Sequence, residues 1–241
     1  MADPRHWLND RVAVVTGASR GIGAATAMAL AGAGAQVILA ARDQSALEGV
    51  ADQIRHGGGT ARAVPTDVSK PAGVDRLFAA AAQAGSPAAL VCAAGVLTSA
   101  AVTDTTDQIW NETLGVNLTG TFLCCRAAFT AMSEAGGGRI VTIASLSGVY
   151  ATEKFPGLAA YNASKFGIVG LTEGLAVEGK QHGISAICVS PGAVDTEMLR
   201  RANPDLRPGL TPGDVADLIL ALLDGPVVPA SGANIPLFSN A

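Results

Sequence analysis

The chain contains two tyrosines, and each stands four residues before a lysine: Tyr150 before Lys154 and Tyr161 before Lys165. On a helix, residues at this spacing lie on one face, about 5–6 Å apart. A lysine cation at that distance stabilises the phenolate, so it lowers the pKa of tyrosine from its ordinary value near 10. Either pair could therefore supply a proton donor and acceptor for a carbonyl or hydroxyl group.

Helix-breaking residues distinguish the two pairs. The first pair runs directly into Phe-Pro-Gly at residues 155–157, and a residue that precedes proline is disfavoured in a helix. The second pair opens a stretch without proline until Pro191. We therefore expect a helix from about residue 160 to 181 that presents Tyr161, whereas Tyr150 lies in a loop on the substrate side.

A glycine-rich turn follows the first apolar run of the chain. Residues 16–23 read TGASRGIG, with glycines at Gly17, Gly21 and Gly23. Glycines permit a tight turn and close approach of a ligand, and the N-terminus of a following helix offers free N–H groups and a positive dipole end. The turn predicts a cradle for the pyrophosphate of a dinucleotide, and a turn without a ligand is the alternative.

Two arginines near this turn bear on the choice of dinucleotide. Arg20 precedes the expected helix, where a cation is unfavourable unless an anion binds, and Arg42 ends the second apolar run. An acidic residue at that strand end would bind the ribose 2′-hydroxyl of NAD, but Ala41 stands before Arg42. The arginines favour the 2′-phosphate of NADP(H). Asp43 could bind a hydroxyl instead, although it is better suited to cap the next helix.

Apolar runs alternate with longer helical stretches along the whole chain. Expected strands cover residues 11–17, 36–42, 60–68, 88–95, 139–145, 184–192 and 232–238. Expected helices cover residues 21–35, 43–59, 71–84, 105–116, 118–134, 160–181 and 212–223. Apolar strands separated by helices form a parallel sheet covered on both faces, so we expect one α/β domain over residues 1–241 with a doubly wound sheet of about seven strands. Pro236 would lie at a sheet edge or beside a bulge.

Composition argues against several classes of function. Hydrophobic residues make up 49% of the 241 residues and charged residues 15%, which indicates a large core. A net charge of −4 does not favour nucleic acid or a membrane surface, and no apolar run reaches the roughly 20 residues of a membrane span. Four cysteines in apolar contexts and three scattered histidines lack metal-ligand spacing. We expect reduced thiols, a cytoplasmic location and no metal.

Several further motifs, in order along the chain, resemble the short-chain dehydrogenase/reductase family from Val12 to about Met198. Besides the glycine turn they are Asp67-Val68, CAAG at 92–95, Asn117 in GVNLTG, Ser145 in IASLSG, Tyr161 and Lys165 in YNASK, and Pro191-Gly192 with Thr196 in SPGAVDT. Cys92 departs from the family, which has asparagine there to steady the sheet, and because a thiol bonds weakly we expect some loss of rigidity. The sixteen residues from Ser145 to Tyr161 are a few more than usual, and the first tyrosine–lysine pair lies among them.

The resemblance implies a Rossmann-type fold and hydride transfer between NADP(H) and a ketone or secondary alcohol. Tyr161 would exchange the proton, Lys165 would lower its pKa and hold the nicotinamide ribose, Ser145 would position the substrate oxygen, and Asn117 would hold a proton-relay water. The cofactor would contact Gly17, Ser19, Arg20, Gly21, Ile22, Gly23, Arg42, Asp67, Val68, Ala93, Ala94, Gly95, Tyr161, Lys165, Pro191, Gly192, Val194 and Thr196. Ser147 and Tyr150 would lie on the substrate side. Taken singly, Ser145 could merely end a strand and Asn117 could kink or cap a helix.

Other functions remain as alternatives. A 3-oxoacyl carrier-protein reductase would need a basic face for its acidic carrier, and residues 131–138 offer no basic side chain. A non-catalytic NADP(H)-sensing protein would be expected to lose Tyr161 or Lys165. A nucleotide-sugar epimerase or dehydratase usually needs an extra substrate domain, for which the 43 residues after Met198 are too few.

Two further expectations concern the surroundings of the site. Residues 199–210 contain two prolines and predict a small or open lid, whose arginines could meet an acidic substrate or simply face solvent.

The apolar helix at 120–132 looks too hydrophobic to face water on all sides. The resemblance implies a homodimer or homotetramer packed through this helix and the one after Tyr161, and burial within one subunit is the alternative.

Overall fold

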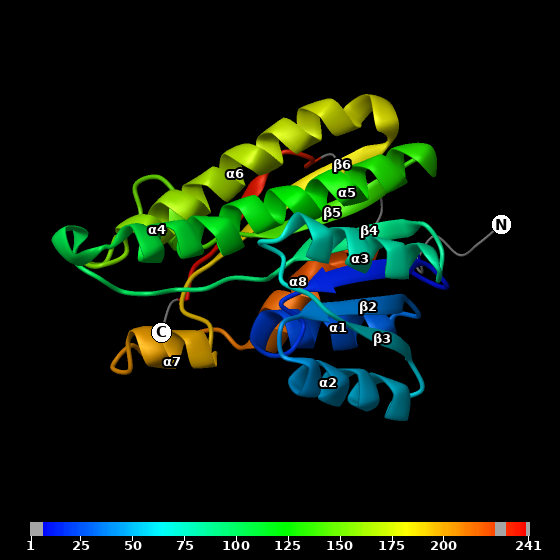
Figure 1. Cartoon of the computed structure of the whole chain (residues 1–241), viewed down its shortest axis with the longest axis horizontal. Helices are drawn as coiled ribbons and strands as arrows, with labels where there is room; N and C mark the ends of the chain where they lie inside the picture. Colours follow the sequence, from blue (N-terminus) through cyan, green and yellow to red (C-terminus); the bar gives the residue numbers. More distant parts are fainter. Residues whose placement is uncertain (1–6, 225–229, 240–241) are drawn as a thin grey trace.

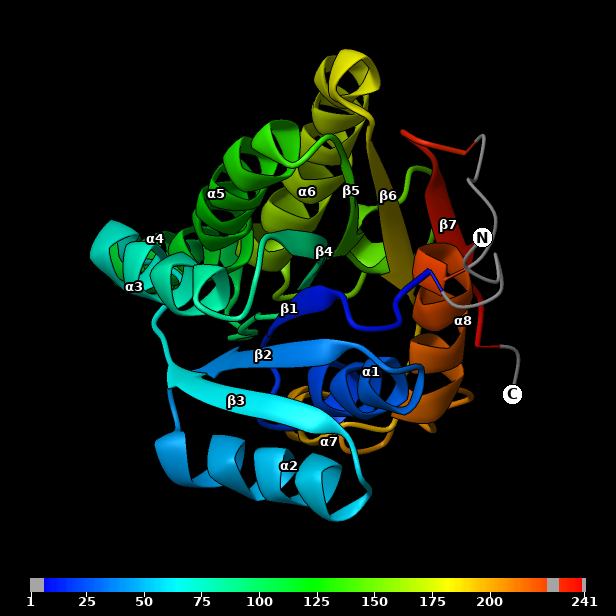
Figure 2. The same cartoon turned by 90° about the vertical axis from the view of Figure 1, so that its right-hand side faces the viewer.

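The computed structural model describes residues 7–224 and 230–239. Within that part of the chain, seven parallel strands form one sheet in the order β3-β2-β1-β4-β5-β6-β7 (Figure 1, Figure 2). The strands are β1 (Val12–Thr16), β2 (Gln36–Ala41), β3 (Thr60–Pro65), β4 (Pro87–Cys92), β5 (Gly138–Ile143), β6 (Ile184–Pro191) and β7 (Asn234–Leu237). The expected doubly wound sheet is confirmed. Its order reverses between β1 and β4, which opens a crevice at the carboxyl ends of these strands.

Helices cover both faces of the sheet. One layer contains α1 (Gly21–Gly32), α2 (Gln44–His56) and α8 (Pro212–Asp224), and the other contains α3 (Pro71–Ala82), α5 (Gly120–Glu134) and α6 (Ala159–Gly179) (Figure 2). Along β1, Ala13 and Val15 join the first core while Val12 and Val14 join the second. Because both faces are buried, the strand is apolar from Val12 to Val15 instead of alternating.

Two connections differ from the elements expected from the sequence. The two helices expected at 105–116 and 118–134 form one run, in which a π-helical turn (Gly115–Thr119) joins α4 (Asp107–Leu114) to α5. The expected lid contains a helix, α7 (Glu197–Ala202), that the sequence reading does not include. Thr196 caps α7 by accepting a hydrogen bond from the Leu199 amide at 3.2 Å. Among the described residues, no helix is both long and apolar enough to cross a membrane.

Proline in the last strand lies where its missing N–H costs least. β7 is one of the two edge strands of the sheet, and Pro236 pairs in register with Ser190 of β6. An edge strand has no neighbour on its outer side, so proline interrupts little of the ladder. The expected edge position is confirmed.

The turn between β1 and α1 is packed so closely that it requires glycine. Gly17 has φ of +66°, and a Cβ on it would lie 2.6 Å from the carbonyl oxygen of Ala93. A Cβ on Gly23 would lie 2.2 Å from the carbonyl oxygen of Gly17. Both neighbours are backbone atoms, so a side chain can be admitted only if the chain itself shifts.

This packing predicts opposite effects of two glycine-to-alanine changes in helices. Gly23→Ala forces backbone apart and should lower the free energy of unfolding by about 1–3 kcal/mol. Gly49→Ala, in an exposed part of α2 with open space around it, should raise it by about 0.5–1 kcal/mol. Urea unfolding of both variants measures the difference, and a Gly23→Ala protein as stable as Gly49→Ala would contradict it.

Candidate active site

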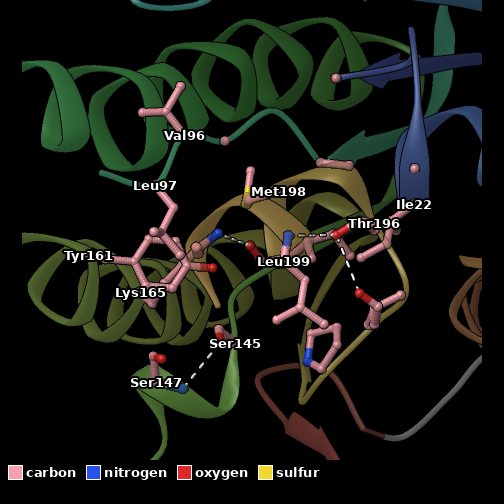
Figure 3. A pocket seen from close by; sticks show the side chains of 18 of the residues that line it. Ile22, Val96, Leu97, Ser145, Ser147, Tyr161, Lys165, Thr196, Met198 and Leu199 are labelled. Carbon is pink, nitrogen blue, oxygen red and sulfur yellow. Dashed lines mark hydrogen bonds between the residues drawn. The ribbon is translucent and has the colours of Figure 1, made fainter. Parts of the chain in front are cut away.

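A cavity of about 1700 Å³ lies at the carboxyl ends of the strands, where the sheet order reverses. Segments far apart in sequence line it: the turn after β1, the loops after β4 and β5, the start of α6, and the chain after β6 including α7 (Figure 3). Among the described residues, every site residue predicted from the sequence contributes to the lining except Asn117. A cavity at this position is the usual ligand site of such a sheet.

Tyr161 and Lys165 lie one turn apart on α6 and point into this cavity (Figure 3). The Nζ atom of Lys165 is 5.4 Å from the centre of the Tyr161 ring and donates a hydrogen bond to the carbonyl oxygen of Ile143 at 2.9 Å. Tyr161 is 9% exposed and Lys165 is 5% exposed. The structure therefore brings a buried phenol and a buried amine together at the end of β5.

Burial controls the protonation of both groups. It raises the pKa of Tyr161 to about 12, and a hydrogen bond with Ser145 acts in the opposite direction. It lowers the pKa of Lys165 to about 8, and the thiol of Cys188 acts against this shift. The lowered tyrosine pKa expected from the sequence is not found in the protein alone, because burial removes water from the phenolate. A phenolate near neutral pH requires a further positive charge, such as that of an oxidised nicotinamide.

Ser145 lies at the end of β5, beside the tyrosine (Figure 3). Its Oγ atom accepts a hydrogen bond from the Ser147 amide at 3.1 Å, which caps the short helix η3 (Leu146–Gly148). The backbone thus occupies one acceptor position of the hydroxyl and leaves its hydrogen able to point elsewhere. Ser145 can donate that hydrogen to a substrate oxygen.

Asn117 lies behind the cavity, fully buried in the π-helical turn. Its Oδ1 atom accepts from the Val96 amide at 2.8 Å, and its Nδ2 atom donates to the Val96 carbonyl and the Ser164 hydroxyl, both at 3.0 Å. A Cβ on Gly95 would lie 3.5 Å from Oδ1 of Asn117 and 3.8 Å from Nζ of Lys165. Asn117 therefore ties the loop after β4 to α6 close to the lysine, and its role in holding water stays a prediction.

The first tyrosine–lysine pair does not form a helical pair. Tyr150 lines the mouth of the cavity and is 88% exposed. Lys154 turns instead to the carbonyl oxygens of Leu146 at 3.0 Å and Val149 at 2.7 Å. As the sequence predicts, residues 150–154 contain no helix. Of the two tyrosines, Tyr161 is the buried one and the one beside its lysine.

The residues around the glycine turn fit a dinucleotide. Arg20 is the N-cap residue of α1, and its side chain does not cap the helix. The turn therefore presents the N-terminus of α1 to the cavity, an arrangement that suits a pyrophosphate. Asp43 accepts a hydrogen bond from the Ala46 amide at 3.0 Å, so the expected cap of α2 is confirmed and Arg42 stands exposed at the end of β2.

Arg42 also influences a carboxylate on the same side of the cavity. Burial raises the pKa of Asp67, but hydrogen bonds from Ser69 and the positive charges of Arg42 and Lys70 bring it below its ordinary value. Asp67 is therefore ionised at neutral pH and able to accept a hydrogen bond from a ligand.

Several charged residues of the cavity are not predicted from the sequence, and Glu197 is the one that pairs with a predicted site residue. Glu197, the first residue of α7, forms ion pairs with Arg20 and with Arg201. Arg20 therefore has a protein carboxylate as its partner. A signal for this helix exists in the sequence, since Thr196 followed by Glu197, with two arginines a turn later, is a common pattern for a short capped helix.

An apolar wall faces the tyrosine. It consists of Leu97 after β4 and of Met198 and Leu199 in α7 (Figure 3). Phe238, near the described end of the chain, also lines the cavity. Leu97 and Phe238 carry no sequence signal of their own, because only the folded chain brings these segments together. The wall gives this side of the cavity an apolar surface.

The four cysteines all lie in the described part of the chain and are buried thiols. Cys92, at the position where the family has asparagine, has its Sγ atom 3.8 Å from that of Cys125. This contact and burial raise the pKa of Cys92 well above its ordinary value, so it stays a neutral thiol. The effect of Cys92 on rigidity stays a prediction.

Known proteins with this fold and these residues identify the family. Residues 11–207 match the short chain dehydrogenase family. An uncharacterized oxidoreductase of Staphylococcus aureus (strain MRSA252) is 37% identical over 220 residues, which cover 91% of this chain and 93% of the relative. A D-threitol dehydrogenase of Mycolicibacterium smegmatis is 40% identical over 196 residues, 81% of this chain and 74% of the relative. A crystal structure of a short-chain type dehydrogenase/reductase from Mycobacterium marinum has a TM-score of 0.90 and 34% identity, covering 96% of this chain and 95% of that one.

The chain therefore belongs to the short-chain dehydrogenase/reductase family. It is an oxidoreductase with a Rossmann-type fold, and the family implies a nicotinamide dinucleotide, NAD or NADP, as cofactor.

Replacing each tyrosine in turn tests the assignment of the proton donor. Tyr161→Phe should lower kcat at least about a hundredfold, because the variant cannot exchange the proton. Binding of the cofactor, measured by fluorescence titration, should persist. Tyr150→Phe is the matched control and should keep most of the turnover. A fatal Tyr150→Phe with a harmless Tyr161→Phe would reverse the assignment.

The lowered pKa of Lys165 predicts a pH-dependent stability. Its folded value of about 8 lies below its ordinary value of 10.5, so between these values the unfolded chain binds more protons and stability rises with pH. Relative to Lys165→Met, the wild-type free energy of unfolding should therefore increase from about pH 7 to about pH 10. Urea unfolding across this range measures the difference, in which other titrating groups cancel, and parallel curves would contradict the prediction.

Proposed function

We propose that the protein is an NADP(H)-dependent oxidoreductase that transfers a hydride between the nicotinamide and a ketone or secondary alcohol. The observation that carries the proposal is that Tyr161, Lys165 and Ser145 line the same cavity as the glycine turn. The bound dinucleotide would supply or accept the hydride. The residues of the chain would handle the proton and the substrate oxygen.

The positions of these groups assign a task to each. Tyr161 donates its hydroxyl hydrogen to the carbonyl oxygen during reduction and takes it back during oxidation. Ser145 donates a second hydrogen bond to the same oxygen. Lys165, with Nζ 5.4 Å from the tyrosine ring, stabilises the phenolate that remains. The presence of the tyrosine and lysine in this arrangement favours an enzyme over a cofactor-sensing protein.

The lining of the cavity supports an apolar substrate. Leu97, Met198 and Leu199 surround the space in front of the tyrosine (Figure 3).

The relative from M. smegmatis, in contrast, is named for D-threitol, a polyol. A panel of ketones and secondary alcohols that includes D-threitol, followed by nicotinamide absorbance with both cofactors, tests the function directly. Absence of turnover on the whole panel would refute the proposal.

The preference for NADP(H) rests on Arg42. Its exposed position at the end of β2, with Asp43 engaged in capping α2, suits a 2′-phosphate better than a ribose hydroxyl. Arg20 supports the proposal less directly, because Glu197 already pairs with it. A bound phosphate would have to compete with that carboxylate.

Assembly, location and domain content belong to the same proposal. Large apolar side chains are exposed on two neighbouring helices: Phe122 on α5, and Phe166 and Val177 on α6. This exposure supports a homodimer or homotetramer packed through these helices.

The four buried thiols support a reducing compartment such as the cytoplasm. The single sheet from β1 to β7 supports one domain over residues 1–241.

Cofactor preference gives a quantitative test. Wild-type kcat/KM with NADPH should exceed that with NADH by roughly tenfold, the effect of one charge-assisted hydrogen bond. Arg42→Ala should remove this preference by weakening NADPH alone, whereas Arg76→Ala, an exposed arginine of α3, should leave it unchanged. Equal wild-type rates with both cofactors would exclude the preference.

A further inference from the structure

The loop that carries the first tyrosine–lysine pair is organised around one side chain. The ammonium group of Lys154 donates hydrogen bonds to the carbonyl oxygens of Leu146 at 3.0 Å and Val149 at 2.7 Å, and to the hydroxyl of Thr152. Three acceptors use the full donor capacity of an ammonium group. The lysine therefore does not simply extend into solvent, although it lies at the surface.

A second side chain strengthens the same loop. The hydroxyl of Thr152 lies 2.6 Å from the carbonyl oxygen of Leu146 and 3.0 Å from that of Val149. Ala151, directly before Thr152, has φ of +59°, a left-handed conformation that a residue with a Cβ adopts only at some cost. Contacts that converge on two carbonyl groups offset that cost and close residues 146–154 into a compact turn.

Lys154 also links this turn to the catalytic helix. Its Nζ atom lies 5.3 Å from the centre of the Phe166 ring, and Phe166 directly follows Lys165 on α6. The backbone of the turn rests on the same place, because a Cβ on Gly148 would lie 2.5 Å from the carbonyl carbon of Lys165. The turn and the helix that carries Tyr161 are thus in contact from two sides.

The two ends of this turn reach the substrate space. At one end, the Ser147 amide donates to Ser145, the residue assigned to the substrate oxygen. At the other end, Phe155 directly follows the turn and is 42% exposed. Tyr150, in the middle of the turn, is 88% exposed, and both residues line the cavity. Ser145 directly follows Ala144, whose amide is bonded to Val189 of β6. A shift of the turn would therefore move the wall formed by the two aromatic side chains and leave Ser145 in place.

We propose that Lys154 is the positioning residue of this wall: it holds the turn so that Tyr150 and Phe155 receive the apolar or aromatic group of a ketone whose oxygen lies at Ser145 and Tyr161. The proposal rests on the ketone reductase function proposed above. Lys154 touches neither the substrate oxygen nor the cofactor site. Because its hydrogen bonds are close to solvent, they contribute little to global stability while they decide the local geometry.

A comparison of two lysine variants with two ketones tests the proposal. Lys154→Met keeps the apolar stem and removes the charge, and Lys180→Met, at an exposed position beyond the far end of α6, is the matched control. With 4-phenyl-2-butanone, Lys154→Met should raise KM about tenfold and leave kcat, NADPH affinity and Tm at the values of the control. With 2-butanone, which lacks the ring, KM should change little.

Hydrogen exchange provides a readout that does not depend on turnover. The amides of Ser147, Gly148 and Val149 are bonded to Ser145 and Leu146 within the turn. They should exchange faster in Lys154→Met and at the wild-type rate in Lys180→Met.

These measurements separate the two proposals. Unchanged exchange in Lys154→Met, or an equal change of KM for both ketones, would overturn the role of Lys154. If the wild-type protein reduced neither these ketones nor any other member of the panel, the proposed function would fail, and the exchange rates would still show whether Lys154 holds the turn.

Discussion

Burial of the Lys165 ammonium group beside Tyr161 constrains the rest of the site. A charge removed from water costs free energy, and the Ile143 carbonyl, 2.9 Å away, offsets part of that cost. The lysine can reach this carbonyl only because α6 packs against the end of β5. The resulting pKa of Lys165, about 8, lies close to neutral pH. A charge brought near the ammonium group can therefore change whether the lysine is protonated. The packing of α6 against the end of β5 thus sets both the position and the protonation of the lysine beside Tyr161.

Contacts between backbone segments hold the elements around this pair at short range. Gly17 brings the turn after β1 against the loop after β4, and Gly148 brings η3 against α6. Asn117 ties the loop after β4 to the same helix through Val96. The groups that would exchange the proton lie on these closely packed elements, whereas the apolar wall comes from connecting segments. Variation of those segments can change the substrate without disturbing Tyr161 and Lys165.

Charges on the cofactor side are partly compensated within the protein. Glu197 pairs with Arg20 and Arg201, and all three side chains are well exposed, so the pairs contribute little to stability. The pair with Arg20 has a positional consequence, since it connects α7 to the glycine turn. Arg42, by contrast, lies at the end of β2 with no carboxylate paired to it among the described ion pairs, which is why the proposed preference for NADP(H) rests on it. The two arginines that the sequence presents as equivalent therefore differ in their surroundings.

Local patterns in the sequence determined the sheet, the glycine turn and the helical position of Tyr161, because each depends on neighbouring residues. Apolar runs bury strands, glycines permit the turn, and a proline at 156 prevents a helix at Tyr150. Only the tertiary structure decided the pairing of Glu197 with Arg20, since the two residues are far apart in the chain. It also decided the contacts of Lys154 and the direction of the tyrosine pKa. The sequence predicts the lysine as a neighbour that lowers this pKa, but burial, which depends on packing of the whole domain, is the larger effect.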